Sequence, residues 1–117
     1  MIYHIAVFSD FKAIDKNGNY RTSTYIKDSF IHCSTLSQIV TVANRYYKNR
    51  KDLILLEIDE EKLNSRVVYE NLEGGAELFP HIYGDIPSRA IIRITPLPDS
   101  PIGFQFPEVW ENFSTKQ

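Results

Sequence analysis

Short runs of apolar or alternating residues punctuate the chain, and runs of this length are typical of β-strands. They predict strands over residues 2–7, 30–33, 53–58, 66–70 and 90–94. The run at 53–58 is the most apolar, so we expect a central strand there with both faces buried. Strand alternation places His4 on a face with Ile2 and Ala6, and His32 on a face with Phe30.

A helical spacing replaces the strand pattern between residues 35 and 47. The apolar positions that share one side of this helix are Leu36, Ile39, Val40, Ala43 and Tyr47. Thr35 and Gln38 have the spacing of a capping box at its start. A shorter helix is expected after Ser9, which can cap it, and a single turn over residues 59–63. Residues 20–26 are mostly polar, which leaves an edge strand or a loop as alternatives.

The order of these elements predicts the fold class. Several strands follow one another with few helices between them, so we expect an α+β domain over residues 1–97. This single compact domain would hold a mostly antiparallel, split or curved sheet and two or three short helices. Residues 98–117 continue a proline-rich stretch and are expected to form an extended tail, packed on the domain through Phe104, Phe106 and Trp110.

Composition narrows the partners and the compartment. A chain of 117 residues with a net charge of −2 has no overall attraction for nucleic acid or for an anionic membrane. The start of the chain does not resemble a signal peptide, and no apolar run reaches the length of a membrane span. The lone Cys33 fits a reducing compartment, so a cytoplasmic location is expected.

Three histidines carry the most informative candidate chemistry. His4 and His32 each interrupt an apolar strand, and His81 lies in the proline- and glycine-punctuated segment 79–84. A buried imidazole needs hydrogen-bond partners, which a shared cleft lined by histidines would provide. The alternative is that each histidine is a core residue bonded to the backbone.

Other polar residues near these histidines extend the candidate site. Ser34 and Thr35 begin the predicted helix and either bind an anion or simply cap the helix. Glu70 and Glu77 are possible acid–base groups, with solvated surface carboxylates as the alternative. Three histidines and a carboxylate would also suit zinc, although no His-x-x-x-His pair is present. Cys33 is expected to fill core volume.

Three segments carry a family resemblance: Tyr3-His4, residues 28–35 and residues 79–84. In this order they resemble the uncharacterised bacterial family called domain of unknown function 952, over roughly residues 1–97. That family is in turn distantly similar to the ADP-ribosyltransferase fold and, within it, to the RNA 2′-phosphotransferases. The chain departs from their pattern at Ile5-Ala6, where those enzymes have Gly-Thr after the first histidine.

The resemblance implies an ADP-ribosyltransferase-like fold with NAD as the ligand. It implies that His4 contacts the ribose, that His32 and Ser34 lie on the nicotinamide or phosphate side, and that His4 and His32 are the catalytic residues. The full set of implied ligand contacts is His4, Tyr20, His32, Ser34, Thr35, His81 and Tyr83.

Three functional hypotheses follow from these residues. The first is binding of NAD or another ADP-ribose-containing nucleotide, with transfer of an ADP-ribosyl group or a 2′-phosphate. The second is a nucleotide-binding module without catalysis. The third is a small histidine-based zinc hydrolase. The expected partner in the first two is a small nucleotide.

Overall fold

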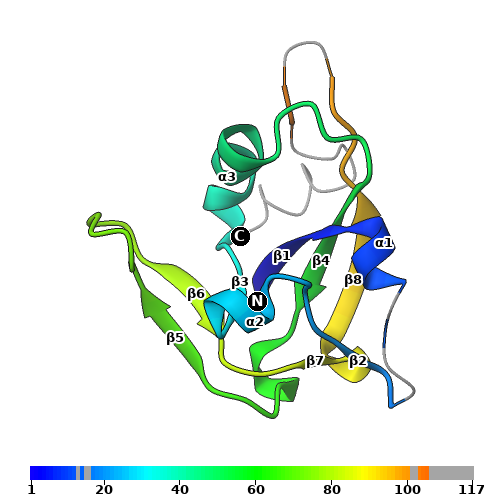
Figure 1. Cartoon of the computed structure of the whole chain (residues 1–117), viewed down its shortest axis with the longest axis vertical. Helices are drawn as coiled ribbons and strands as arrows, with labels where there is room; N and C mark the ends of the chain where they lie inside the picture. Colours follow the sequence, from blue (N-terminus) through cyan, green and yellow to red (C-terminus); the bar gives the residue numbers. More distant parts are fainter. Residues whose placement is uncertain (13, 15–16, 101–102, 106–117) are drawn as a thin grey trace.

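The central element of the fold is a three-stranded antiparallel sheet in the order β1–β4–β8, seen in the computed structural model (Figure 1). The structure describes residues 1–12, 14, 17–100 and 103–105. The strands are β1 (Ile2–Val7), β4 (Leu53–Ile58) and β8 (Ile91–Pro96). All six residues of β4 are buried, which confirms the central strand expected from its apolar run.

Two smaller antiparallel sheets complete the strand framework. The first has the order β3–β6–β5, from β3 (Ile31–His32), β6 (Phe79–Ile82) and β5 (Val67–Glu70). The second pairs β2 (Asn19–Tyr20) with β7 (Ile86–Pro87). A bridge between Tyr3 and Ser34 ties the central sheet to the segment after β3. The expectation of a single compact α+β domain with antiparallel sheets is confirmed.

The helices are short. They are α1 (Phe8–Phe11), α2 (Tyr25–Asp28), α3 (Ile39–Tyr46) and the single 3-10 turns η1 (Leu36–Gln38), η2 (Glu60–Lys62) and η3 (Ser88–Ala90).

Two helix predictions and one strand-or-loop prediction need correction or refinement. The expected helix over 35–47 is divided into η1 and α3, although the backbone N–H of Thr35 donates to Gln38 Oε1 at 2.9 Å as a capping box requires. The prediction that Ser9 caps α1 is wrong, because the helix begins two residues earlier than expected, at Phe8, and Val7 is its N-cap residue. Residues 20–26, expected as an edge strand or a loop, contain the end of β2 and the start of α2.

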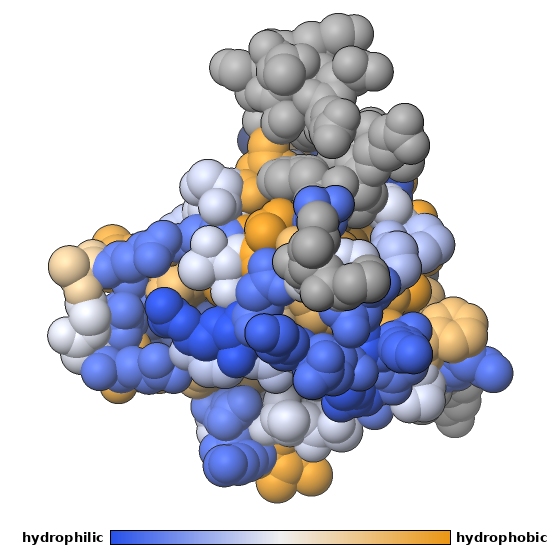
Figure 2. Space-filling model, turned by 90° about the horizontal axis from the view of Figure 1, so that it is seen from above, coloured by the Kyte–Doolittle hydropathy of each residue, from blue (hydrophilic) through white to orange (hydrophobic). Residues whose placement is uncertain are grey.

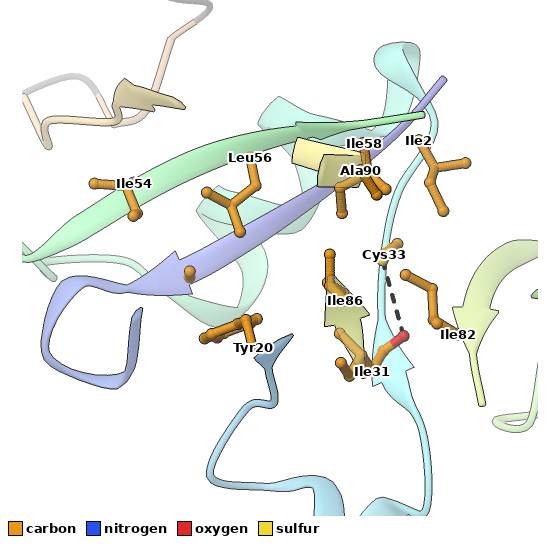
Figure 3. Packing of buried hydrophobic residues seen from close by; sticks show 11 residues of the cluster. Ile2, Tyr20, Ile31, Cys33, Ile54, Leu56, Ile58, Ile82, Ile86 and Ala90 are labelled. Carbon is orange, nitrogen blue, oxygen red and sulfur yellow. Dashed lines mark hydrogen bonds between the residues drawn. The ribbon is translucent and has the colours of Figure 1, made fainter. Parts of the chain in front are cut away.

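Two hydrophobic clusters cover the two faces of the central sheet. One joins β1 and β4 to the smaller sheets through Tyr20, Cys33, Ile82 and Ile86, whose side chains converge in Figure 3. The other lies under α3 and includes the buried Phe104. Phe106 and Trp110, also expected to pack there, lie outside the described residues.

The thiol of Cys33 is a probe of this core. Its side chain is buried, its Sγ lies 3.8 Å from the carbonyl oxygen of Ile31, and burial raises the thiol pKa (Figure 3). The thiolate is the reactive form of cysteine. We therefore expect a chromogenic thiol reagent to react with Cys33 of the native protein only at the rate at which the core opens. In urea, where the chain is unfolded, the same reagent should react at once. Rapid labelling of the native protein would contradict this packing.

Among the residues that the structure describes, no helix has the length and apolar character needed to cross a membrane. In the view from above, hydrophilic residues dominate the visible face and hydrophobic ones are scattered among them (Figure 2). The hairpin formed by β5 and β6 projects from the body at the left of Figures 1 and 2. Residues of this hairpin and of α3 line the candidate site described below.

Candidate functional site

A cleft of about 380 Å³ lies where the β5–β6 hairpin, β3, α2 and α3 approach one another. All three histidines line it, so the structure brings together the residues that the sequence singled out. The other lining residues are aromatic, acidic, small polar or aliphatic side chains from four segments: Thr22, Thr24 and Asp28; Phe30; Val42, Tyr46 and Tyr47; Glu70, Asn71, Leu72, Glu73 and Phe79.

Strand register brings His32 and His81 together. The two are directly paired across β3 and β6, and directly paired residues point to the same face of a sheet. His81 is also paired with Val68 of β5, so Glu70, two positions along that strand, projects from the same face. Three residues that are far apart in sequence therefore form one row along the wall of the cleft.

The row is connected by hydrogen bonds. Nδ1 of His32 lies 3.2 Å from Nε2 of His81, and Nδ1 of His81 lies 2.9 Å from Oε1 of Glu70. The Tyr83 hydroxyl donates a short hydrogen bond to the same carboxylate oxygen. The order Glu70–His81–His32 resembles the carboxylate–imidazole arrangement that orients a general base, extended by one imidazole.

The carboxylate fixes the tautomer of each ring. Ionised Glu70 only accepts hydrogen bonds, so His81 donates to it from Nδ1. When the His81 ring is neutral, its Nε2 is therefore an acceptor. His32 must then donate from its own Nδ1. Its Nε2 keeps a lone pair, and this nitrogen has no hydrogen-bond partner among the described residues. The cleft wall therefore presents an unprotonated imidazole nitrogen.

Electrostatics favour a neutral His32 and an ionised Glu70 at neutral pH. Burial lowers the pKa of His32, and the neighbouring His81 lowers it further. Hydrogen bonds from Tyr83 and His81 lower the pKa of Glu70, while the bond to Glu70 raises the pKa of Tyr83. We call the hydrogen-bonded row Glu70–His81–His32 the relay. A neutral His32 at one end and an ionised Glu70 at the other are what proton transfer to His32 would need.

His4 has a different position in the site. Its Nδ1 lies 2.7 Å from the carbonyl oxygen of His32, and its Nε2 lies 3.2 Å from the Tyr20 hydroxyl. Because the carbonyl can only accept, His4 donates from Nδ1 and accepts the Tyr20 hydroxyl at Nε2. Burial lowers the pKa of His4 to about 4. Both ring nitrogens are therefore occupied within the protein, and the Nδ1 hydrogen bond ties His4 of β1 to the backbone of β3 at His32.

The remaining predicted site residues lie around the cleft rather than along it. Tyr20 and Ser34 are buried, and the backbone of Ser34 pairs with Tyr3. Thr35 takes part in the capping interaction with Gln38. Glu77 accepts a hydrogen bond from Gln38 Nε2 at 3.0 Å and lines a separate hollow of about 60 Å³. Tyr83 reaches the site through Glu70.

Sequence reasoning missed the aromatic walls. The ring of Phe30 stacks on His81 with centroids 4.0 Å apart and planes 15° apart, and Phe79 lies against His32 at 5.4 Å. Tyr46 of α3 donates from its hydroxyl to Glu73 Oε2 at 3.3 Å and so connects the helix to the hairpin tip. The adjacency of Phe30 to the His32 strand was visible in the sequence, but the approach of Tyr46 to Glu73 depends on the fold.

A metal centre has no complete ligand set within the described residues. No group of three His, Cys, Asp or Glu side chains there has the arrangement to hold a metal ion. The contacts between His32, His81 and Glu70 are hydrogen bonds through ring nitrogens that a metal would need.

Comparison with known proteins gives the family and the fold. The family model described as protein of unknown function DUF952 matches residues 5–94, so the chain belongs to this family. The crystal structure of protein CC0527 from Caulobacter crescentus is similar, with a TM-score of 0.79, 24% identity and coverage of 97% of each chain. The solution structure of the same protein gives a TM-score of 0.75 and 26% identity over 95% of this chain and 94% of that one. No curated protein gives a significant match.

Proposed function

We propose that this chain binds NAD, or another ADP-ribose-containing nucleotide, through its nicotinamide–ribose end in the His-lined cleft, and transfers the ADP-ribosyl group. The proposal includes that the domain has an ADP-ribosyltransferase-like fold. One observation carries it: the Glu70–His81–His32 relay presents an unprotonated nitrogen to a cleft with aromatic walls. A relay of this kind suits proton transfer from a ligand hydroxyl.

The dimensions and walls of the cleft support a flat ring with an attached sugar. About 380 Å³ is within the range of small-molecule sites and is too little for a whole dinucleotide. Phe30 and Phe79 flank the histidines and offer ring faces or edges for stacking. The rest of the nucleotide would extend into solvent.

The residues of the relay have separate roles in transfer. When bound, NAD would supply a ribose carbon from which nicotinamide departs with the bonding electron pair. Nε2 of His32 accepts the proton of the attacking hydroxyl or water, and the positive charge that develops on His32 is stabilised through His81 by Glu70. His4 holds the His32 carbonyl and so keeps the base on the cleft wall.

Transfer of a 2′-phosphate has weaker support. Lys and Arg side chains are absent from the cleft lining within residues 1–12, 14, 17–100 and 103–105, so a phosphate would have no cationic partner there. ADP-ribosyl transfer to a hydroxyl, or to water, needs no such partner. A nucleotide-binding module without catalysis would use the same cleft. Only the release of nicotinamide distinguishes it from a transferase.

Calorimetry with NAD, followed by an assay for released nicotinamide, tests the proposal. We expect wild type to bind NAD and His32→Gln to bind about tenfold more weakly, because a hydrogen bond of about 1.5 kcal/mol is lost. Lys62→Gln, an exposed change on η2, is the matched control and should bind as wild type does.

The two readouts separate the hypotheses. Binding with nicotinamide release supports a transferase or glycohydrolase, and binding without release supports the module. Failure of wild type to bind millimolar NAD, or equal binding by wild type and His32→Gln, would overturn the assignment of this cleft.

A further inference from the structure

We infer that the cleft selects a positively charged aromatic ring over a neutral ring of the same size, and excludes a negatively charged one. This inference names the ligand class of the cleft described above and so rests on the proposed function for its link to NAD, whose oxidised nicotinamide ring is a cation. It depends on two features of the lining, its charges and its aromatic walls, which come from different elements of the fold.

All the formal charges on the cleft lining, within the described part of the chain, are negative. Asp28 lies at the end of α2, Glu70 at the end of β5 and Glu73 in the hairpin tip. Asp28 and Glu73 both lie near enough to His32 to oppose the lowering of its pKa. The carboxylates of Asp28 and Glu73, which come from different segments, therefore both act on the His32 ring. A cationic ligand bound beside His32 would be attracted to the same two carboxylates.

Cations do occur nearby, but they are directed elsewhere. Arg66 lies over the ring of Tyr83, with its Cζ 5.2 Å from the centroid, and Arg21 pairs with Asp85. Arg45 lines the smaller hollow beside Glu77. None of the three is part of the main cleft lining, so these arginines do not neutralise its wall.

The two exposed acids are expected to set the selectivity. Glu70 is committed to His81 and Tyr83, which already stabilise its charge. Asp28 and Glu73 remain exposed to solvent, and Glu73 has the Tyr46 hydroxyl as a neutral partner. Exposed carboxylates act through water, so the expected preference is modest, about threefold to tenfold in affinity per unit of ligand charge.

Aromatic rings add a second preference of the same sign. Tyr46, the last residue of α3, and Tyr47, which follows it, line the cleft together with Phe79 of the hairpin. The face of an aromatic ring carries negative charge density and attracts a cation. A flat cation between these walls gains stacking and charge attraction together, whereas a flat anion gains stacking alone.

Three pyridines of nearly equal size test this inference: 1-methylnicotinamide, a cation; nicotinamide, which is neutral; and nicotinate, an anion. Titration followed by amide chemical shifts of the full chain measures dissociation constants in the millimolar range. We expect affinity to fall in that order, with shifts at His32, Glu73 and Phe79. The gap between cation and anion should shrink as salt rises from 20 to 500 mM.

Charge-neutral variants assign the effect to the two acids. Glu73→Gln keeps an oxygen for Tyr46 and should reduce the preference for 1-methylnicotinamide over nicotinamide about threefold, and Asp28→Asn should do the same. Glu61→Gln removes an equal charge at an exposed position on η2, outside the cleft, and should leave the preference unchanged.

The outcomes separate this inference from the proposed function. Equal affinities for the three pyridines, or tighter binding of nicotinate, would overturn the charge preference even if NAD binds. Charge-ordered binding of the pyridines without any binding of NAD would support the preference and reject the dinucleotide as ligand. A preference that survives both acid variants would overturn its assignment to Asp28 and Glu73.

Discussion

Replacing Glu70 with glutamine is expected to lower the rate of nicotinamide release by about 10²- to 10⁴-fold, the usual contribution of a positioned acid–base group. The amide keeps the shape of the carboxylate but removes its charge. An amide nitrogen can also turn towards Nδ1 of His81 and force the opposite tautomer, in which Nε2 of His81 carries the proton. His32 would then lose its acceptor, and its free nitrogen would no longer be fixed as a base.

Nitrogen-15 spectra of the histidine rings measure this effect without any substrate. In wild type we expect the rings of His4 and His32 to be neutral at pH 7.5, each with its single ring proton on Nδ1, because burial lowers the pKa of both. This pattern differs from the Nε2-protonated form that free histidine favours. Glu70→Gln should change the tautomer of His81 and His32 and leave that of His4, which is set by the His32 carbonyl.

Two further variants test whether the lower rate of nicotinamide release in Glu70→Gln comes from the lost charge at this position. Tyr83→Phe removes one donor to Glu70 but keeps the charge, so a smaller loss in rate is expected, with the tautomers preserved. Glu61→Gln is the charge-matched control on the surface. If His32 in wild type carries its proton at Nε2, the relay has the wrong direction and His32 is not the base.

The sequence predicts the strands better than the site because the two depend on different information. The run 53–58 is apolar at nearly every position, and this local pattern is enough to predict a strand covered on both sides. By contrast, α2 has few apolar residues and no clear periodicity, and its Ile26 is exposed. Its helical turn is held by backbone hydrogen bonds to residues 22–25, which no hydrophobic pattern reveals.

Convergence of the histidines depends on strand register. Which residue of β6 faces His32 is decided by pairing between segments almost 50 residues apart, and a shift of one position would turn His81 to the other face. The sequence could place His32 and His81 on strands or loops of the same domain. It could not establish that Glu70 would complete their row.

His4 shows why residue type alone does not separate ligand contacts from structural groups. The family resemblance implied a ribose contact, and His4 does line the cleft. Its two nitrogens are nevertheless taken by the His32 carbonyl and the Tyr20 hydroxyl, and Tyr20 comes from β2, a strand that the sequence left uncertain. The role of His4 in NAD binding is therefore a positioning role in our proposal.

The occupied state of His4 predicts a pH-dependent stability. The pKa of His4 is about 4 in the folded protein and near 6.5 in the unfolded chain, so the unfolded chain binds more protons between these values. The stabilisation is complete above pH 6.5 and is lost as the pH falls towards 4. At about 1.4 kcal/mol per pKa unit, this contribution is on the order of 3 kcal/mol.

Urea unfolding of wild type and His4→Gln at pH 7.5 and pH 4.5 isolates this contribution. Glutamine can still donate to the His32 carbonyl but does not titrate, so the variant should be less stable at pH 7.5 and lose less stability on acidification. The difference between the two losses is expected to approach 3 kcal/mol, because the carboxylates and His32, whose pKa is also lowered, remain in both proteins. Tyr20→Phe keeps His4 and should retain the acid sensitivity.

A titration of His4 in the wild-type protein gives an independent measurement that does not depend on how well the variant folds. The ring signals of His4 in wild type should report a neutral imidazole down to about pH 5, well below the value at which a solvent-exposed histidine gains its proton. A His4 that titrates near pH 6.5 in the folded protein would be open to solvent. Its ring would then be available to a ligand, and the positioning role assigned to it would have to be replaced by direct contact.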